Sequence, residues 1–365
     1  MKAVAAVLRE PRGRLRLEDV ELDDPRAGEV VVRIAGVGIC HTDLGACDGH
    51  LPLPVPVVLG HEGAGVVERV GDGVLSLQSG DHVVLTFDSC GACPTCRGGH
   101  PAYCREFVAR NSTGRRCDGS VTMRQGDADV HGSFLGQSSF TTHALASVRN
   151  AVRVDDDLPI ARLGPLGCSL QTGAGAVLRV LAPEAGSSLA VFGCGPVGMA
   201  SVMAARAAGC TTLVAVDPDP GRRELALELG ATVALDPEGV ARGIRQLVPG
   251  GVDCAVETVG TAEVVDAALA SLASPGRCAT LGFRGPRNRI EIDQGHLLMG
   301  RTLTGVIEGD VDPHTFIGDL LALHRTGLFP FERLITTYPF EEIERAIEDT
   351  RRGAVLKPVL LMPGA

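Results

Sequence analysis

Residues 187–210 have the sequence SSLAVFGCGPVGMASVMAARAAGC, which decides the fold of the second half of the chain. The apolar run at 189–192 is typical of a buried strand; a glycine-rich turn follows at 193–198, and a helix-like run comes after it. The same order then repeats, with a second apolar strand that ends at Asp217. Strands that alternate with helices of about ten to fifteen residues indicate parallel βαβ units.

The glycine-rich turn fits the pattern G-x-G-x-x-G, and its place between a strand and a helix predicts a dinucleotide site. Its glycines allow a tight turn and a close approach to a pyrophosphate, and free N–H groups at the helix N-terminus bind the phosphates. Asp217 would accept hydrogen bonds from the adenosine ribose, which favours NAD over NADP, although Arg222 and Arg223 weaken that preference. A purely structural turn with a solvated aspartate is the alternative, and the complete βαβ context disfavours it. The predicted cofactor-binding residues of this segment are Gly193, Gly195, Pro196, Val197, Gly198, Asp217 and Arg222.

The composition limits the class of protein. The chain has 365 residues, enough for about two domains, and 45% of them are apolar. Its net charge of −10 argues against nucleic acid or an anionic membrane as the main partner, since both bind clustered Lys and Arg. The sequence has no signal-like N-terminus and no run of about 18 apolar residues, so we expect a cytoplasmic protein. Its cysteines are then expected to be thiols or metal ligands rather than disulfides.

The segment CGACPTCRGGHPAYC, residues 90–104, places four cysteines in a short loop with the spacing C-x₂-C-x₂-C-x₇-C. Such a loop can bring four soft ligands within ~2.3 Å of one tetrahedral zinc ion. An iron–sulfur cluster is the other metal option, but nothing else in the sequence indicates electron transfer. Because four thiolates leave no open position, the sequence predicts a structural zinc site. Its ligands would be Cys90, Cys93, Cys96 and Cys104.

The rest of the chain has a different pattern. Up to about residue 150, short Val-rich segments such as EVVVRIAGVGIC and GDHVVLTF alternate with glycine and proline, which predicts an all-β region. Residues 105–139 lack periodicity and are interpreted as a long surface loop. The tail is expected to contain helices at 313–326 and 341–352, followed by a final strand KPVLLMP.

Three further candidate ligands, Cys40, His61 and Cys168, are far apart in sequence, and spacing alone would not unite them. A lone cysteine or histidine in a Val-rich region is usually a buried residue without a special role. Their neighbours change this interpretation, since they lie in the segments GICHTD, GHEGAGVV and GPLGCSLQTGAG.

With these segments, the chain resembles the zinc-containing alcohol dehydrogenases of the medium-chain dehydrogenase/reductase superfamily. The resemblance covers essentially the whole chain and rests on GICHTD, GHEGAGVVERVG, CGACPTCRGGHPAYC, GPLGCSLQTGAGAV and GCGPVG with its following AVD, in the family's order. It implies an α/β fold in which a Rossmann doubly wound parallel sheet is inserted into a GroES-like, mainly-β catalytic domain. The expected catalytic domain comprises residues 1–169 and 309–365, and the Rossmann domain comprises residues 170–308.

The resemblance implies an open catalytic zinc site that takes a water or the substrate as its fourth ligand. Asp43 matches a residue that hydrogen-bonds the ligating histidine and fixes its tautomer. Glu62 matches an acidic residue behind the zinc, and Thr42 matches a hydroxyl that passes the alcohol proton towards the cofactor ribose. The implied zinc ligands are Cys40, His61 and Cys168.

The resemblance also assigns cofactor contacts and reveals one departure. His41 and Lys357 match basic contacts to the pyrophosphate, and Thr172 matches a residue near the nicotinamide carboxamide. Gly45 occupies the position where many members carry a terminal relay histidine. His50 is a candidate substitute, and a surface position for it is equally compatible with the sequence.

The segments LTFDSCGAC and HGSFLGQSSFTTHALA most resemble the aryl-alcohol (benzyl alcohol) branch, which includes dehydrogenases of allylic terpene alcohols such as geraniol. That branch implies NAD-dependent oxidation of a primary alcohol to the aldehyde. A pocket for such flat substrates would be apolar, although each phenylalanine can equally be a core residue. The candidate wall residues are Leu51, Phe87, Phe134 and Phe140.

Two other functions are compatible with parts of the sequence. A thiol-dependent formaldehyde dehydrogenase would need cations for a charged adduct, and Arg110, Arg115 and Arg116 are candidates. A non-catalytic NAD-binding protein on the same scaffold would typically have lost metal ligands, which this chain retains. The resemblance further implies a homodimer or homotetramer that associates through a strand near residues 302–307.

Overall fold

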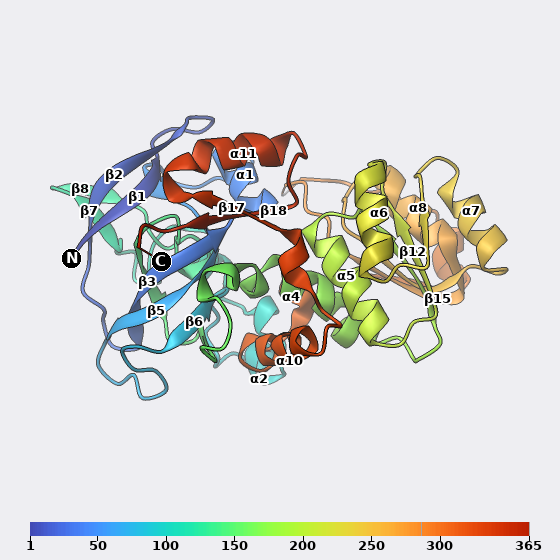
Figure 1. The fold of residues 1–365 in the computed structure, drawn as a ribbon, viewed down its shortest axis with the longest axis horizontal. Helices are drawn as coiled ribbons and strands as arrows, with labels where there is room; N and C mark the ends of the chain where they lie inside the picture. Colours follow the sequence, from blue (N-terminus) through green and yellow to red (C-terminus); the bar gives the residue numbers. More distant parts are fainter. Residues whose placement is uncertain (286, 365) are drawn as a thin grey trace. The chain divides into compact units, whose positions relative to one another are not determined.

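The structure is a computed structural model, and it describes residues 1–285 and 287–364. Its contacts divide the chain into two compact units (Figure 1). The first comprises Met1–Cys168, Asp312–Gly318 and Glu332–Ala365, and the second comprises Ser169–Val311 and Asp319–Phe331.

The domain boundaries expected from the sequence stay a prediction, and the division by contacts distributes residues 312–364 over both units. The single helix α10 (Pro313–Arg325) runs past Gly318, so its first turns group with the first unit and its remainder with the second. Because one rigid helix contributes to both groups, no sharp boundary in sequence exists there.

The first unit is built on two mainly antiparallel sheets. One has the order β4-β1-β2-β7-β8, with β4 (Val57–Val58), β1 (Lys2–Leu8), β2 (Leu15–Leu22), β7 (Met123–Gln125) and β8 (Ala128–Val130). The other has the order β10-β6-β5-β3-β18-β17, with β9 (His143–Ser147) also paired to β3. Its strands are β10 (Ala151–Val154), β6 (His82–Leu85), β5 (Glu62–Val70), β3 (Glu29–Gly38), β18 (Lys357–Leu361) and β17 (Ile335–Pro339). The predicted all-β character of this region is confirmed.

Strand β3 is the central element of the first unit because it pairs with β5, β9 and β18. Its Val-rich sequence is buried on both faces, as expected for a strand enclosed by neighbours. The last strand, β18, closes the sheet against β3, and Figure 1 shows α11 (Ile343–Arg351) beside β17 and β18. The expected helix at 341–352 and final strand are thereby confirmed.

The second unit contains a six-stranded parallel sheet with the order β13-β12-β11-β14-β15-β16. The strands are β13 (Val233–Leu235), β12 (Thr212–Val216), β11 (Ser188–Phe192), β14 (Val252–Glu257), β15 (Leu272–Thr280) and β16 (Arg301–Gly305). The connecting helices are α5 (Pro196–Ala207), α6 (Pro220–Leu229), α7 (Val240–Leu247), α8 (Ala262–Ser271) and α9 (Gln294–Leu298). The strand order reverses between β11 and β14, so right-handed connections place helices on both faces. The predicted doubly wound sheet is confirmed.

The interpretation of residues 105–139 as a surface loop is wrong. The segment contains α3 (Phe107–Asn111), β7 and β8, and several of its side chains from residue 130 onwards are buried. Strands of three residues are too short to produce a period of two that can be recognised in the sequence. Their burial is decided by partners elsewhere in the chain.

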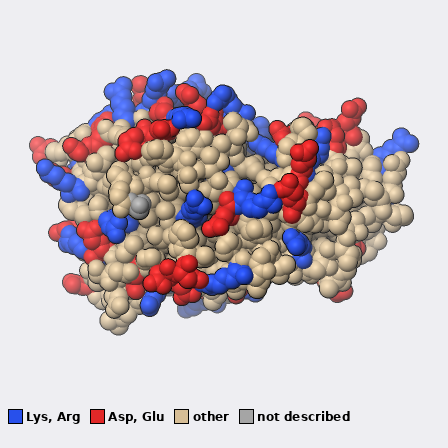
Figure 2. Space-filling view, in the orientation of Figure 1, with Lys and Arg blue, Asp and Glu red and all other residues tan. Residues whose placement is uncertain are grey.

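The distribution of charged side chains on the surface is consistent with the net charge of −10. On the face shown in Figure 2, acidic and basic side chains are interspersed rather than gathered into a basic patch. Within the described residues, no helix is both long and apolar enough to cross a membrane.

Two glycines of the turn at 193–198 differ in the space available to a side chain. A Cβ at Gly198 would lie 1.8 Å from the Gly193 carbonyl oxygen, whereas a Cβ at Gly195 would meet nothing within 4 Å. Gly198→Ala is therefore expected to destabilise the second unit by roughly 1–3 kcal/mol, which thermal unfolding would measure. Gly195→Ala should leave the unfolding midpoint unchanged but raise the dissociation constant for NAD, because the open space at Gly195 is where we expect the pyrophosphate to approach the turn. Equal effects of both substitutions on stability would contradict this assignment.

Candidate active site

Four potential metal ligands from three distant segments converge in the first unit. Cys40 directly precedes α1 (His41–Cys47), His61 and Glu62 lie at the start of β5, and Cys168 follows a short 3-10 helix, Gly164–Gly167. One ligand atom from each of these four residues lies within 4.8 Å of those of the other three. The side chains of His61, Glu62 and Cys168 are buried, and that of Cys40 is half-buried.

The hydrogen bonds of His61 leave one ring nitrogen directed to this cluster. Its Nδ1 lies 2.9 Å from Asp43 Oδ1, and the same carboxylate accepts hydrogen bonds from the backbone N–H groups of Cys40 and Gly60 at 2.9 and 3.1 Å. A carboxylate in this setting accepts, so Nδ1 carries the proton and Nε2 has the free lone pair. Among the described residues, this buried Nε2 has no hydrogen-bond partner.

The donor set fits a zinc ion. Two cysteine sulfurs and one imidazole nitrogen are the ligand types that zinc prefers, and three protein ligands leave a fourth position for a water or a substrate. The orphaned Nε2 of His61, which no protein group satisfies, is explained if a metal ion occupies the cluster. Thr42 is adjacent, with its hydroxyl oxygen 3.8 Å from Cys40 Sγ.

Lys357 does not lie where the resemblance places it. Its ammonium donates to both carboxylate oxygens of Glu62, at 2.9 and 2.8 Å, and to the Ile39 carbonyl at 3.1 Å. Lys357 is 1% exposed and Glu62 is fully buried. All three N–H donors of the lysine therefore have protein acceptors, which leaves none for a pyrophosphate. A buried lysine is rarely found unpaired, but the local sequence KPVLL does not identify its partner.

The predicted four-thiol site also forms. The sulfurs of Cys90, Cys93, Cys96 and Cys104 lie within 4.8 Å of one another. Backbone N–H groups donate to the sulfurs of Cys90 and Cys104 at 3.2–3.4 Å. Similar backbone donors, from Arg105 and Cys96, lower the pKa of Cys93 to about 5. Burial instead raises the pKa of Cys96 to about 12 and also raises the pKa of Cys104. The surrounding groups therefore favour the thiolate, the form that binds a metal ion, at Cys90 and Cys93. All twelve cysteines of the chain are free of disulfides.

A buried network attaches the four-thiol loop to the sheet. Asp88 accepts a hydrogen bond from Arg110 at 2.8 Å, and Asn111 binds both the N–H and the carbonyl of Asp88 at 2.8 and 2.9 Å. Arg149 donates to the Ser89 carbonyl at 2.9 Å. These contacts hold the residues immediately before Cys90.

In the second unit, the glycine-rich turn joins β11 to α5, and Gly193 has a φ of 92°, which favours glycine. Asp217 follows β12 and is 4% exposed; its carboxylate accepts hydrogen bonds from the N–H groups of Cys194 at 2.7 Å and Asp219 at 2.9 Å. Burial and the nearby Asp217 carboxylate raise the pKa of Cys194 to about 12.

Arg222 and Arg223, which lie close to Asp217 in the sequence, differ in their hydrogen-bond partners. Arg223 donates to the carbonyls of Asp217 and Pro218 at 2.7 and 2.9 Å, so its guanidinium is engaged within the loop. Arg222 is half-buried at the start of α6, where its backbone N–H donates to the capping Asp219.

The remaining predicted site residues differ in their exposure to solvent. His41 and His50 are exposed, and Thr172 is half-buried in α4 (Ser169–Gly175). A Cβ at Gly45 would meet nothing within 4 Å. The role of His50 as a substitute for the relay histidine stays a prediction.

The candidate wall residues are mainly core residues. Phe87, Phe134 and Phe140 all belong to the hydrophobic core of the first unit, and Leu51 packs against it half-buried. Phe87 contacts Phe107, with ring centroids 6.0 Å apart, and Phe140 is fully buried. Their assignment to a pocket wall stays a prediction. Phe134 is different, because its ring packs edge-on against the His61 imidazole, with centroids 5.6 Å apart.

One residue of the site had no signal in the sequence. Gln137 binds the backbone at His61 and Gly63, yet it lies in the segment that was interpreted as a surface loop. Its amide is as polar as that of any exposed glutamine, so only the folded structure reveals its role.

The Lys357–Glu62 pair predicts a large effect on stability. Lys357→Met leaves a buried carboxylate without its cation, which is expected to lower the free energy of unfolding by about 3–5 kcal/mol in urea titrations. Combining it with Glu62→Gln should recover most of that loss. Arg69→Met, which breaks an exposed ion pair with Asp24, is the matched control and should leave the midpoint unchanged. Equal midpoints for Lys357→Met and Arg69→Met would contradict the importance of the buried pair.

Comparisons with known proteins agree with this geometry. Residues 26–156 match the family model of the alcohol dehydrogenase GroES-like domain, and residues 196–324 match that of the zinc-binding dehydrogenase. A geraniol dehydrogenase of Castellaniella defragrans is 46% identical over 366 residues, which cover 99% of this chain and 98% of the relative.

Solved structures give the same result. An alcohol dehydrogenase zinc-binding domain protein from Burkholderia ambifaria matches with a TM-score of 0.98 and 47% identity, over 100% of this chain and 99% of that one. Benzyl alcohol dehydrogenase from Acinetobacter calcoaceticus matches with a TM-score of 0.95 and 39% identity, over 99% of both chains. The chain therefore belongs to the zinc-dependent alcohol dehydrogenases of the medium-chain dehydrogenase/reductase superfamily.

Proposed function

We propose that this alcohol dehydrogenase oxidises aromatic or allylic primary alcohols to aldehydes with NAD, at a zinc ion held by Cys40, His61 and Cys168. The convergence of these three ligands around an unpartnered imidazole nitrogen is the observation that carries the proposal. The substrate class is supported by two similar proteins, a geraniol dehydrogenase and a benzyl alcohol dehydrogenase. Both named alcohols have the hydroxyl carbon beside a double bond or an aromatic ring.

When bound, the zinc ion polarises the substrate hydroxyl and the nicotinamide ring accepts a hydride. The residues of the chain have supporting roles. Asp43 fixes the tautomer of His61, so that Nε2 stays available as a ligand. Thr42 holds its hydroxyl beside Cys40, where it could accept the proton that leaves the alcohol while it passes its own hydroxyl proton on towards the cofactor ribose. Asp217, at the end of β12, is positioned for the adenosine ribose of the cofactor.

The four-thiol site is proposed to hold a second, structural zinc ion. Its four sulfurs complete a tetrahedral coordination without an open position, so it can take part in no chemistry on a substrate. Its contribution would be to fix the loop at 90–104.

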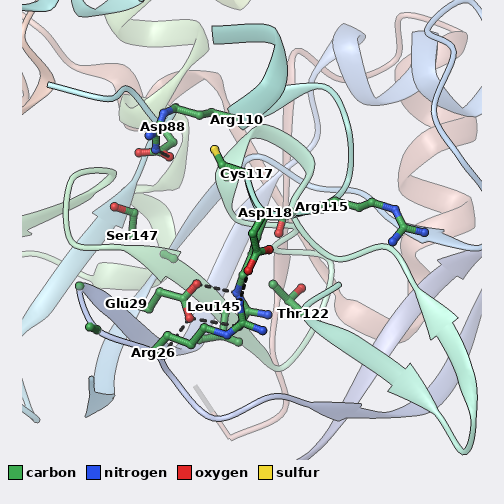
Figure 3. A pocket seen from close by; sticks show the side chains of 16 residues that line it. Arg26, Glu29, Asp88, Arg110, Arg115, Cys117, Asp118, Thr122, Leu145 and Ser147 are labelled. Carbon is green, nitrogen blue, oxygen red and sulfur yellow. Dashed lines mark hydrogen bonds and ion pairs between the residues drawn. The ribbon is translucent and has the colours of Figure 1, made fainter. Parts of the chain in front are cut away.

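The thiol-dependent formaldehyde function is less well supported. Arg110, Arg115 and Arg116 line a cavity of about 290 Å³ in the first unit (Figure 3). Each of them has an acidic partner: Arg110 has Asp88 at 2.8 Å, Arg116 has Glu29 at 2.6 Å, and Arg115 has Asp129 at 3.7 Å. A charged thiol adduct would have to compete with these carboxylates. A non-catalytic role is disfavoured because the ligand set for the catalytic metal is complete.

Steady-state kinetics test the proposed function. We expect kcat/KM for geraniol or benzyl alcohol with NAD to exceed that for ethanol, and we expect no activity with formaldehyde and a thiol cofactor. Cys168→Ser should lower kcat/KM by about 10³-fold, since loss of roughly 4 kcal/mol of polarisation corresponds to that factor. A higher kcat/KM for the formaldehyde adduct than for every alcohol would favour the alternative function.

We further propose that two copies of the chain associate through β16. In the described residues, β16 pairs with β15 alone and ends the parallel sheet, so its outer edge is available to a second strand. Exposed apolar side chains lie nearby at Leu298, Met299 and Ile307.

The cytoplasmic location expected from the sequence stays a prediction.

Sedimentation equilibrium tests this association. The Val306 N–H donates to the Thr280 carbonyl on β15, so the alternate residue Leu303 directs its N–H to the outer edge. We expect a mass of two or four chains, and Leu303→Pro should reduce it because proline removes an N–H group from that outer edge. A wild-type protein that sediments as a single chain would refute the proposed interface.

A further inference from the structure

Residues 134–139 form a buried segment with an unusual backbone beside the catalytic cluster. Leu135, Gly136 and Ser138 have φ values of 48°, 71° and 50°, in the left-handed region that disfavours residues other than glycine. Such a conformation persists only where the surrounding structure fixes it, and it is frequent at functional sites. The segment is held by Ser138, whose hydroxyl donates to the Val58 carbonyl at 2.6 Å.

Gln137, in the middle of this segment, is fully buried and makes four hydrogen bonds with its amide. Its Nε2 donates to the carbonyls of His61 at 3.0 Å and Thr86 at 3.2 Å. Its Oε1 accepts from the N–H of Gly63 at 3.1 Å and from the hydroxyl of Ser139 at 2.9 Å. Two carbonyls can only accept and an N–H can only donate, so these partners fix the orientation of the amide.

These bonds connect two of the proposed zinc ligands. The His61 carbonyl and the Gly63 N–H belong to the segment that presents the His61 imidazole. Thr86 continues the connection, because its hydroxyl donates to the Gly167 carbonyl at 2.6 Å, directly before Cys168. One buried amide therefore joins the backbone that carries His61 to the backbone that carries Cys168.

The close approach needed for these bonds is built into the sequence. A Cβ at Gly63 would lie 2.6 Å from Ser139 Cβ and 3.1 Å from Gln137 Oε1. A Cβ at Gly167 would lie 2.0 Å from the Leu85 carbonyl oxygen. Only glycine at both positions lets the three segments meet.

We infer that Gln137 is a positioning residue that sets the spacing between His61 and Cys168 and so holds the catalytic metal site in its binding geometry. It touches neither the reacting atoms nor the metal, and it acts through the backbone of both ligands. The inference rests on the proposed function in one respect, namely that Cys40, His61 and Cys168 bind a metal ion.

Release of zinc from the intact, metal-loaded protein to a coloured chelator tests this role. Gln137→Glu keeps the size and the accepting oxygen of the side chain but removes the N–H donors to two carbonyls. We expect one of the two zinc ions to leave about 10-fold faster than in the wild type, the range found when groups behind metal ligands are altered. Asn111→Asp is the matched control, a buried amide that instead binds Asp88 beside the four-thiol loop. It should accelerate release of the other zinc ion.

Cobalt substitution identifies which site has changed. The visible absorption of cobalt bound by two thiolates and an imidazole differs from that of cobalt bound by four thiolates. Gln137→Glu should alter the first spectrum and Asn111→Asp the second. Circular dichroism and thermal unfolding establish that each variant is folded.

The outcomes separate the inference from the proposed function. A wild-type protein that binds one metal ion per chain, with a cobalt spectrum of four thiolates alone, would overturn the proposed catalytic site. A wild-type protein with two, and a folded Gln137→Glu variant with unchanged release and an unchanged cobalt spectrum, would overturn the inference alone. If Gln137→Glu does not fold, Thr86→Val decides, because it removes the hydroxyl bond to Gly167 and keeps the size of the side chain. Faster release from that variant supports the connection, and unchanged release refutes it.

Discussion

The pairing of Gly38 with Glu62 across β3 and β5 is the constraint on which the catalytic cluster depends. It sets Cys40, which follows β3, beside His61, which precedes β5. Gly38 has no side chain, and a Cβ there would lie 2.0 Å from Glu62 Oε2. The space it leaves is filled by the carboxylate of Glu62, which reaches through to Lys357 on the neighbouring strand β18. Strands β3, β5 and β18 thus position two proposed metal ligands at their ends and contain the buried ion pair of Glu62 and Lys357.

Burial makes the charges around this cluster interdependent. Glu62 and Asp43 are carboxylates with almost no exposure to water, and an unpaired charge in such a place is costly. Lys357 compensates Glu62, while Asp43 is stabilised by two backbone N–H groups and the imidazole of His61. With these partners satisfied inside the protein, His61 Nε2 is the buried nitrogen of the cluster that a metal ion would satisfy.

The two proposed metal sites are positioned by buried amides of the same kind. Asn111 holds Asp88 next to the four-thiol loop, and Gln137 holds the segments of His61 and Cys168. In both cases the amide bonds to backbone groups whose positions are set by the sheets, so the rigidity of the sheets is passed on to the ligands. The arginines near the first of these networks are engaged by acidic partners, which gives them a structural use rather than a binding one.

The sequence by itself determined the features whose chemistry is local in the chain. The four-thiol site, the glycine-rich turn, the parallel βαβ units and the late helix and strand follow from spacing and periodicity over at most a few tens of residues, and all are present in the structure. A shared metal site of Cys40, His61 and Cys168 was expected only from the resemblance to the alcohol dehydrogenase family, because their spacing in the sequence does not indicate it. Tertiary structure alone decided that Lys357 binds Glu62, which lies 295 positions away, that Phe87 and Phe140 belong to the core, and that residues 134–139 are buried. The physical reason is the same for each: their contacts are set by strand pairing between distant segments, and such pairing leaves no mark on the local sequence.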